Sequence, residues 1–207
     1  MITIYSLSLK IKKRQILKNI NIEIQNGLAY GLVGNNGCGK TMLMKCIVGL
    51  IKPTEGKVVA DGKIIGKDVD FLEDVGLIIE NPGFVSFYSG FRNLKSLAYI
   101  NNKIDDNKIK ECMKICGLDP ELKLSFKKYS LGMKQRLGIA QAIMEDPQYL
   151  ILDEPMNGLD KNGVKDVRKI LLDLKSSGKT IIMSSHNASD IESICDVVFE
   201  MDGGEII

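Results

Sequence analysis

Residues 34–41, Gly-Asn-Asn-Gly-Cys-Gly-Lys-Thr, combine residue types and a spacing that bind phosphate. They fit the pattern G-x-x-x-x-G-K-S/T, in which backbone N–H groups form an anion nest and the start of a helix adds the positive end of its dipole. In this pattern Lys40 reaches the β- and γ-phosphates of a nucleotide, and the Thr41 hydroxyl binds Mg²⁺. The alternative is a glycine turn that happens to precede Lys-Thr.

The flanking sequence favours the phosphate site. Residues 28–33 have the apolar character of a strand buried in a parallel sheet, and apolar residues follow the loop at helical spacing. Strand, glycine loop and helix are the context in which the pattern binds a nucleotide. The predicted nucleotide contacts are Gly34, Asn35, Asn36, Gly37, Cys38, Gly39, Lys40, Thr41 and Met42.

Two acids, Asp153 and Glu154, follow the apolar strand pattern at 149–152. A carboxylate at the end of a strand beside the phosphate loop can hold Mg²⁺, and we assign this role to Asp153. Glu154 then points toward the γ-phosphate and can orient or deprotonate a water for in-line attack. Taken alone, the two acids also fit a solvated strand end, but nucleotide hydrolysis needs acids of this kind.

The single histidine, His186, follows another apolar strand pattern at 180–183. A neutral imidazole there can bind the γ-phosphate or polarise the attacking water. An isolated histidine is more often a surface residue. The carboxyl end of a parallel strand is where α/β sheets place ligands, so the catalytic interpretation is preferred.

Residues 129–136, Tyr-Ser-Leu-Gly-Met-Lys-Gln-Arg, open a helix with Ser130 as its N-cap. Capping alone accounts for the serine. The functional alternative is a second helix start that binds phosphate, formed by Ser130 and Gly132. Because it lies far along the chain from Lys40, it would serve the nucleotide of a partner subunit.

Strand patterns alternate with helix patterns along the chain, which indicates an α/β fold with a parallel sheet. Asp61-Gly62 is a hairpin signal, and 80–83 has the composition of a loop. From 89 to 146 helical spacing replaces the strand pattern, with Asp105 or Asp106 as one N-cap. A further helix follows at 164–174. The predicted strands are residues 2–9, 16–24, 28–33, 57–60, 63–65, 75–79, 149–152 and 180–183.

The composition is that of an ordinary soluble protein: 207 residues, 44% hydrophobic and 26% charged. A net charge of +2 gives no electrostatic case for nucleic acid, and the basic cluster at 10–14 fits a hairpin turn better than a binding patch. No apolar run approaches the length of a membrane span, and no signal peptide is evident. The five cysteines lack zinc or redox spacing, which favours a reduced, cytosolic compartment.

The ordered set of motifs resembles the ATP-binding cassette (ABC) ATPases along essentially the whole chain. Residues 34–41 resemble Walker A, 150–154 Walker B with the catalytic glutamate, and 185–186 the switch histidine. Residues 157–160, ending in Asp160, resemble the D-loop, and 130–136 are similar to the L-S-G-G-Q segment. The resemblance implies a head-to-tail dimer in which each ATP lies between one subunit's phosphate loop and the other's Ser130/Gly132 helix end.

The family also implies a fold and a division of the chain. The fold is that of a P-loop NTPase (RecA-like), with a parallel-sheet core, an antiparallel β subdomain and an inserted helical subdomain. We expect one domain, 1–207, in which 1–88 and 147–207 form the nucleotide-binding core with its β subdomain, and 89–146 the helical subdomain.

The sequence departs from the family pattern in three places. Leu131 and Met133 replace a Gly and the Gln of the L-S-G-G-Q segment. Ile11 stands where the family usually has an aromatic residue that stacks on adenine. Glu80 stands where the family has its Q-loop glutamine, which touches the metal shell, although a solvated loop acid is the simpler interpretation of this residue. Glu80 and the 130–136 segment together resemble the branch that serves bacitracin export and lantibiotic self-protection.

The resemblance implies the ATPase subunit of a transporter that drives a separate membrane permease, peripheral on the inner face of the cell membrane and using ATP and Mg²⁺. Two alternatives are a soluble ABC ATPase acting as a non-transport interaction module and a switch that binds ATP with negligible hydrolysis. An apolar cluster after the Glu80 loop fits either a groove for a permease helix or the core of the helical region. The cluster consists of Phe84, Phe87, Tyr88 and Phe91.

Overall fold

The computed structural model describes residues 1–80 and 83–207, and the predicted loop residues Asn81 and Pro82 lie outside the described residues. The chain begins with an antiparallel sheet in the order β2-β1-β4-β5. In β2, apolar side chains at every second or third position are buried while their neighbours are exposed, as the alternating pattern predicts. The sheet consists of β1 (Ile2–Ile11), β2 (Arg14–Ile24), β4 (Glu55–Ala60) and β5 (Lys63–Ile64).

A second sheet has the strand order β10-β9-β3-β8-β7-β6. Its strands from β9 to β6 are parallel, and β10 is antiparallel to β9. The predicted α/β fold with a parallel sheet is confirmed. The strands β9 and β10 have no counterpart among the predicted ones. The sheet consists of β3 (Ala29–Val33), β6 (Val75–Ile78), β7 (Tyr149–Leu152), β8 (Thr180–Ser184), β9 (Val197–Asp202) and β10 (Glu205–Ile206).

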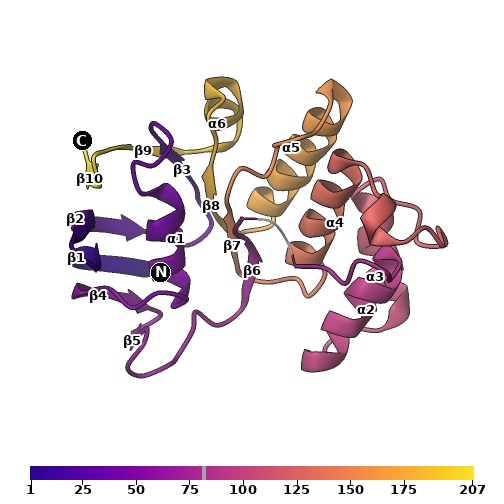
Figure 1. Cartoon of the computed structure of the whole chain (residues 1–207), viewed down its shortest axis with the longest axis horizontal. Helices are drawn as coiled ribbons and strands as arrows, with labels where there is room; N and C mark the ends of the chain where they lie inside the picture. The colour runs from indigo at the N-terminus through magenta and orange to yellow at the C-terminus, as the bar shows by residue number, and fades with distance from the viewer. Residues whose placement is uncertain (81–82) are drawn as a thin grey trace.

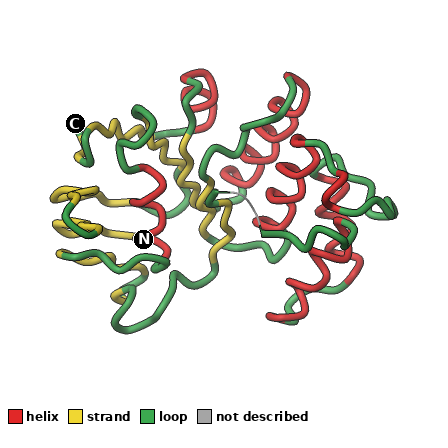
Figure 2. The backbone as a smooth tube through the Cα atoms, in the orientation of Figure 1, coloured by secondary structure: helices red, strands yellow, loops and turns green. Residues whose placement is uncertain are grey.

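The helices separate into two layers. The helix after the phosphate loop, α1, lies between the two sheets, and α4 and α5 cover the other face of the parallel sheet, with α2 and α3 beyond them (Figure 1; Figure 2). None of the described helices is both long and apolar enough to cross a bilayer. The helices are α1 (Lys40–Val48), α2 (Gly90–Asn101), α3 (Asp106–Ile115), α4 (Leu131–Ile143), α5 (Lys161–Ser176) and α6 (Ala188–Ile194), with a 3₁₀ turn at Phe126–Lys128.

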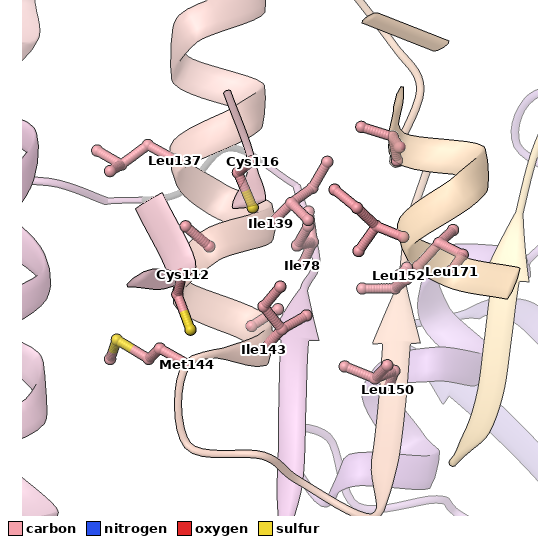
Figure 3. Packing of buried hydrophobic residues seen from close by; sticks show 14 of the residues in the cluster. Ile78, Cys112, Cys116, Leu137, Ile139, Ile143, Met144, Leu150, Leu152 and Leu171 are labelled. Carbon is pink, nitrogen blue, oxygen red and sulfur yellow. The ribbon is translucent and has the colours of Figure 1, made fainter. Parts of the chain in front are cut away.

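The parallel sheet divides two hydrophobic clusters. One joins α1 to both sheets, and the other joins the far face of the parallel sheet to the helical layer. In the second cluster Ile139 and Ile143 of α4 lie beside Ile78 of β6, and Leu152 of β7 lies beside Leu171 of α5 (Figure 3). Cys116 is buried there as a small apolar side chain, and burial raises the pKa of its thiol to about 12.

The backbone of helix α4 packs directly against the backbone of strand β6 at Gly76. A Cβ at Gly76 would lie 1.9 Å from the Ala142 carbonyl oxygen, so only glycine fits this position of the strand. The helical region and the parallel sheet therefore share one continuous core. The division into a core and a helical subdomain at 89–146 stays a prediction.

Candidate nucleotide-binding site

The phosphate loop lies between the end of β3 and the start of α1. Gly34 has φ of 144°, and a Cβ there would lie 2.2 Å from the Met201 carbonyl oxygen, which explains the glycine. Lys40 is buried, and its Nζ donates to the carbonyl oxygens of Gly34 at 2.6 Å and Asn35 at 3.2 Å. These bonds hold an ammonium group over the loop at the start of α1.

A chain of hydrogen bonds joins the loop to the ends of two neighbouring strands. Thr41 Oγ1 donates to Asp153 Oδ2 at 2.6 Å, and Ser184 Oγ donates to Asp153 Oδ1 at 2.6 Å. Ser184 Oγ also accepts from the Glu154 backbone N–H at 2.9 Å. Because β3, β8 and β7 are adjacent and parallel, their carboxyl ends bring Thr41, Asp153 and Glu154 to one edge of the sheet.

Glu154 and His186 are in direct contact. His186 Nδ1 lies 2.8 Å from Glu154 Oε2, with the histidine side chain 70% exposed and the glutamate 25% exposed. Glu154 has φ of 51°, a left-handed conformation that side chains other than glycine rarely adopt. Such local strain is frequent where a protein fixes a reactive group.

Lys40, Thr41, Asp153 and Glu154 open onto a hollow of about 320 Å³, which Asn36, Gly37, Gly39 and Met42 also line. His186 lines a separate hollow, together with Gly34, Asn35 and Asn36. Cys38 is buried beneath the loop, with its Sγ 3.8 Å from Lys40 Nζ. The lining residues are Arg14, Ile16, Asn36, Gly37, Gly39, Lys40, Thr41, Met42, Asp153 and Glu154.

Ile11 was predicted to contact the base, but it is not among the residues that line this hollow. It is exposed at the end of β1 and pairs across the hairpin with Arg14. The first residues of β2, Arg14 and Ile16, line the hollow instead. The hairpin between β1 and β2 therefore presents its second strand, rather than its first, to the phosphate loop.

Ser130, Gly132 and Asp160 line a different hollow of about 600 Å³, which shares no lining residue with the first. Ser130 Oγ caps α4 by accepting from Met133 N–H at 3.2 Å, and Asp160 caps α5 by accepting from Gly163 N–H at 2.7 Å. Within one chain, the helix end at Ser130 is thus not brought to Lys40.

The departure at Leu131 has a local explanation. The Leu131 side chain lies against Gly158, where a Cβ would be 2.5 Å from Leu131 Cδ2. Gly158 has φ of 76°, so glycine is required there by conformation as well as by space. The leucine packs on the neighbouring loop and leaves the start of α4 open at Ser130 and Gly132.

Glu80 pairs with a lysine. Its Oε1 lies 2.5 Å from Lys45 Nζ on α1, with the Glu80 side chain 65% exposed. Glu80 also has φ of 61°. The structure therefore brings this predicted metal ligand to Lys45, whereas it brings the other two, Thr41 and Asp153, to each other.

Four residues of this site, Ser184, Gln135, Arg14 and Ile16, were not predicted from the sequence. Ser184 is fully buried between Asp153 and Glu154, and Gln135 Nε2 donates to the carbonyl oxygens of Pro155 at 2.9 Å and Glu154 at 3.3 Å. Arg14 and Ile16 line the hollow. The position of Ser184 at the end of an apolar strand, one residue before Ser185-His186, was the available signal for the serine. Gln135, Arg14 and Ile16 carried no comparable signal.

The chain belongs to the ABC transporter family, whose family model matches residues 17–157. It is accordingly an ATP-binding protein with ATPase activity, as the P-loop, the strand-end acids and the histidine predicted.

Several curated proteins are similar to it along most of its length. The uncharacterized ABC transporter ATP-binding protein YybJ of Bacillus subtilis is 47% identical over 206 residues, which cover 100% of this chain and 94% of YybJ. The bacitracin transport ATP-binding protein BcrA of Enterococcus faecalis is 43% identical over 93% of this chain, which spans 63% of BcrA. The lantibiotic transport ATP-binding protein SrtF of Streptococcus pyogenes is 38% identical, covering 100% of this chain and 89% of SrtF.

A solved structure shows the same fold. The ATP-binding cassette MJ0796, in a dimeric post-hydrolysis state bound to ADP and Pi, matches with a TM-score of 0.89 over 100% of this chain and 96% of MJ0796, at 22% identity. The predicted fold, a P-loop NTPase with parallel and antiparallel sheets and added helices, is confirmed.

Proposed function

We propose that this chain uses Mg²⁺ and ATP, pairs with a second ATPase subunit, and drives a membrane permease that moves peptide antibiotics. The observation that carries the catalytic part is the hydrogen-bond chain from Thr41 through Asp153 and Ser184 to Glu154 and His186. It gathers a hydroxyl, two carboxylates and an imidazole beside the buried Lys40 ammonium. Hydrolysis of a nucleotide needs these groups together.

The residues at the strand ends fit Mg²⁺. Thr41 Oγ1 and Asp153 Oδ2 are hard oxygen donors 2.6 Å apart. Among the described residues, no cluster of three or more His, Cys, Asp or Glu side chains would form a complete protein cage. This suits Mg²⁺, which binds through one or two protein oxygens, water and the phosphates of the substrate. The ion would supply charge neutralisation on the phosphates.

Glu154 is the proposed general base. Its backbone N–H is fixed by Ser184 and its carbonyl by Gln135, so its carboxylate is held at the edge of the hollow. His186 contacts the carboxylate and fixes its direction. Lys40, with its ammonium over the loop, stabilises negative charge that develops on the phosphates.

The Ser130/Gly132 helix end is the proposed contact for a nucleotide held by a second subunit. It lies in a hollow of its own with Asp160, and therefore needs a phosphate from outside the chain to act on. The start of α4 offers N–H groups and a positive dipole end to such a phosphate. One nucleotide would thus be held between the P-loop of one subunit and α4 of another.

The proposed cargo follows from similarity to BcrA and SrtF, whose names state bacitracin and lantibiotic transport. The cargo path would lie in a separate permease, and this chain would bind the cytoplasmic face of that permease. Of the cluster considered for a permease groove, Phe84 and Phe91 pack on the hydrophobic core, whereas Phe87 is 71% exposed. Tyr88 is half-buried, and Arg92 lies over its ring, so Phe87 is the most exposed member of the cluster.

Substituting Glu154→Gln tests the catalytic proposal. The amide keeps the size of the side chain but cannot accept a proton, so turnover should fall by about 10²–10⁴-fold while ATP binding is retained. The variant should also accumulate as a dimer with ATP, measured by light scattering after size exclusion. Glu55→Gln, an exposed glutamate on β4, is the matched control. Turnover at the parent rate in Glu154→Gln would show that another group is the base.

Growth assays test the cargo. Cells carrying the chain with its neighbouring permease genes should tolerate more bacitracin or lantibiotic than cells carrying the Glu154→Gln version. Equal sensitivity of the two strains to every peptide antibiotic tried, with normal ATPase activity of the purified chain, would reject the cargo and leave the ATPase assignment intact.

A further inference from the structure

Arg14 lies at the rim of the nucleotide hollow. It is the first residue of β2, it is exposed, and it lines the hollow together with Ile16. Residues two apart in a strand point to the same face, so the guanidinium and the half-buried Ile16 side chain lie on one side of β2. The other charged residues that line the hollow are Lys40, Asp153 and Glu154.

Arg14 differs from the other arginines in its contacts. Arg92 lies over the Tyr88 ring at 3.8 Å, Arg136 pairs with Asp166 at 2.8 Å, and Arg168 pairs with Asp190 at 2.7 Å. Within residues 1–80 and 83–207, Arg14 has neither a carboxylate partner nor an aromatic ring beneath it. Its planar guanidinium is therefore free to meet a ligand.

The hollow offers a nucleotide base no aromatic surface. None of the described residues that line it is Phe, Tyr, Trp or His. Ile11, which pairs with Arg14 across the hairpin, is aliphatic. A guanidinium is planar and weakly hydrated, and it stacks on aromatic faces as well as binding anions. Among the described residues that line the hollow, Arg14 thus carries the largest planar group and the single guanidinium.

We propose that Arg14, lying over Ile16, is the base-binding residue of the nucleotide site and stacks flat on the purine. The proposal rests on the proposed nucleotide site around Lys40. Stacking is tolerant of base identity because every base has a π-face. Arginine offers five donors and no acceptor, so it makes no hydrogen bond that demands the adenine amino group. The site should therefore accept GTP about as well as ATP.

Competition with a ligand that has no base separates stacking from phosphate binding. Affinities of the full chain for ATP, GTP and inorganic tripolyphosphate, each with Mg²⁺, are measured by displacement of a fluorescent nucleotide. Arg14→Ala should weaken ATP and GTP by about three- to tenfold and leave tripolyphosphate unchanged. Arg14→Lys keeps the charge but not the plane, so it should behave like Arg14→Ala. Arg14→Tyr should restore ATP affinity.

Lys13→Ala is the matched control, because Lys13 belongs to the same hairpin but does not line the hollow. It should leave all three affinities unchanged. Equal weakening of ATP and tripolyphosphate in Arg14→Ala would place Arg14 on the phosphates and overturn the proposal. Unchanged ATP affinity in that variant, or a preference of the parent chain for ATP over GTP of more than about tenfold, would also overturn it. If instead Lys40→Ala binds ATP and tripolyphosphate with the parent affinities, the assignment of the nucleotide site to the loop around Lys40 is wrong.

Discussion

Helices α1 and α4 both begin at a predicted phosphate contact, but their N-terminal caps differ. Helix α1 starts after Gly39, whose φ of 118° leaves it without a side-chain cap, and its first residue is the buried Lys40. Helix α4 starts after Ser130, whose hydroxyl accepts from Met133 N–H. Neither helix has an acidic residue in its first turn. The N–H groups in the first turn of α1 therefore have no side-chain acceptor from the cap residue, whereas one N–H group in the first turn of α4, that of Met133, has one.

This difference separates the tasks of the two helix ends. A positive side chain at a helix start opposes the dipole, so Lys40 at the start of α1 is costly unless an anion approaches. At α4 an incoming phosphate would compete with Ser130 for the Met133 N–H, so its binding there is stabilised less than its binding at α1. Under the proposed function, the α1 start holds the nucleotide, and the α4 start responds to a nucleotide that another subunit already holds.

The largest expected effect is at α1. Lys40→Ala removes the ammonium that the loop carbonyls hold over the phosphate site, and turnover should fall by about 10²–10³-fold. ATP affinity should fall as well, as measured by isothermal titration. Lys52→Ala, an exposed lysine just beyond α1, should show neither loss. Turnover at the parent rate in Lys40→Ala would show that the start of α1 does not hold the nucleotide phosphates, and the proposed difference between α1 and α4 would be wrong.

A smaller effect is expected at α4. Ser130→Ala should lower turnover by about tenfold, the loss from one hydrogen bond to a charged group, while a single subunit binds ATP normally. Unfolding should become easier by about 1 kcal/mol through loss of the cap. Ser125→Ala is the matched control, because Ser125 caps the 3₁₀ turn without a side-chain hydrogen bond. A weaker ATP affinity of the isolated Ser130→Ala subunit would show that the two helix starts of one chain act on the same nucleotide, against the proposed sharing between subunits.

The Lys45–Glu80 pair provides a third comparison, away from the first turn of α1. Glu80→Gln should change basal turnover by about two- to fivefold, because the ion pair is exposed on the Glu80 side and worth at most about 1 kcal/mol. If Glu80 acts only through Lys45, then Lys45→Gln and the double variant should match it. A shift in the Mg²⁺ dependence of turnover in Glu80→Gln, absent from Lys45→Gln, would instead restore Glu80 as a metal ligand.

The smallest expected effect concerns the strand that leads to α1. Asp196 accepts from Ala29 N–H at the start of β3 and from Lys175 Nζ, both at 2.9 Å. Burial favours the neutral acid, but these two hydrogen bonds and the lysine charge outweigh it and lower the pKa of Asp196 below 3.8. The lowered pKa stabilises the folded chain above about pH 3.8, and this stability is lost as pH falls through the folded-state pKa.

Asp196→Asn should therefore lower Tm near pH 7 by about 2 °C, a small shift because solvent screens a side chain that is one third exposed. The difference from the parent should shrink as the pH falls below about 3.8, and nucleotide affinity should not change. Asp202→Asn, an exposed acid on β9, is the control. A Tm difference that is constant from pH 3 to 7 would show that charge is not the reason for the loss.

The sequence was informative wherever a local pattern carries its own physical cause. Asp61-Gly62 predicted its hairpin because both residues adopt positive φ, 47° and 81°. Ser130 and Asp105 predicted the starts of their helices because their side chains accept from backbone N–H groups. The strand ends at Asp153 and His186 predicted a shared edge because parallel neighbours end together.

Contacts between distant segments were not encoded in any local pattern. Glu80 was predicted at the metal from its position in the family pattern, and no feature of the sequence shows that Lys45, 35 residues earlier, lies within reach. Ile11 was predicted at the base from its position in the family pattern, whereas the hairpin register, which decides whether β1 or β2 faces the loop, is a property of the folded sheet. The last helix and β10 have seven and two residues, and their apolar periodicity is too brief to separate them from loop. Strand β9 has six residues, but it mixes apolar residues with Glu200 and Asp202.

The contact at Gly76 has a mechanical consequence. Helix α4 begins at Ser130 and reaches the Ala142 carbonyl, which lies so close to β6 that a methyl group would not fit. The strand on which it rests ends at Ile78, two residues before Glu80. Helix α4 and strand β6 are therefore in direct backbone contact near the C-terminal end of the helix. A displacement of the Ser130 end of α4 would be passed to β6 through this contact, and from β6 toward Glu80.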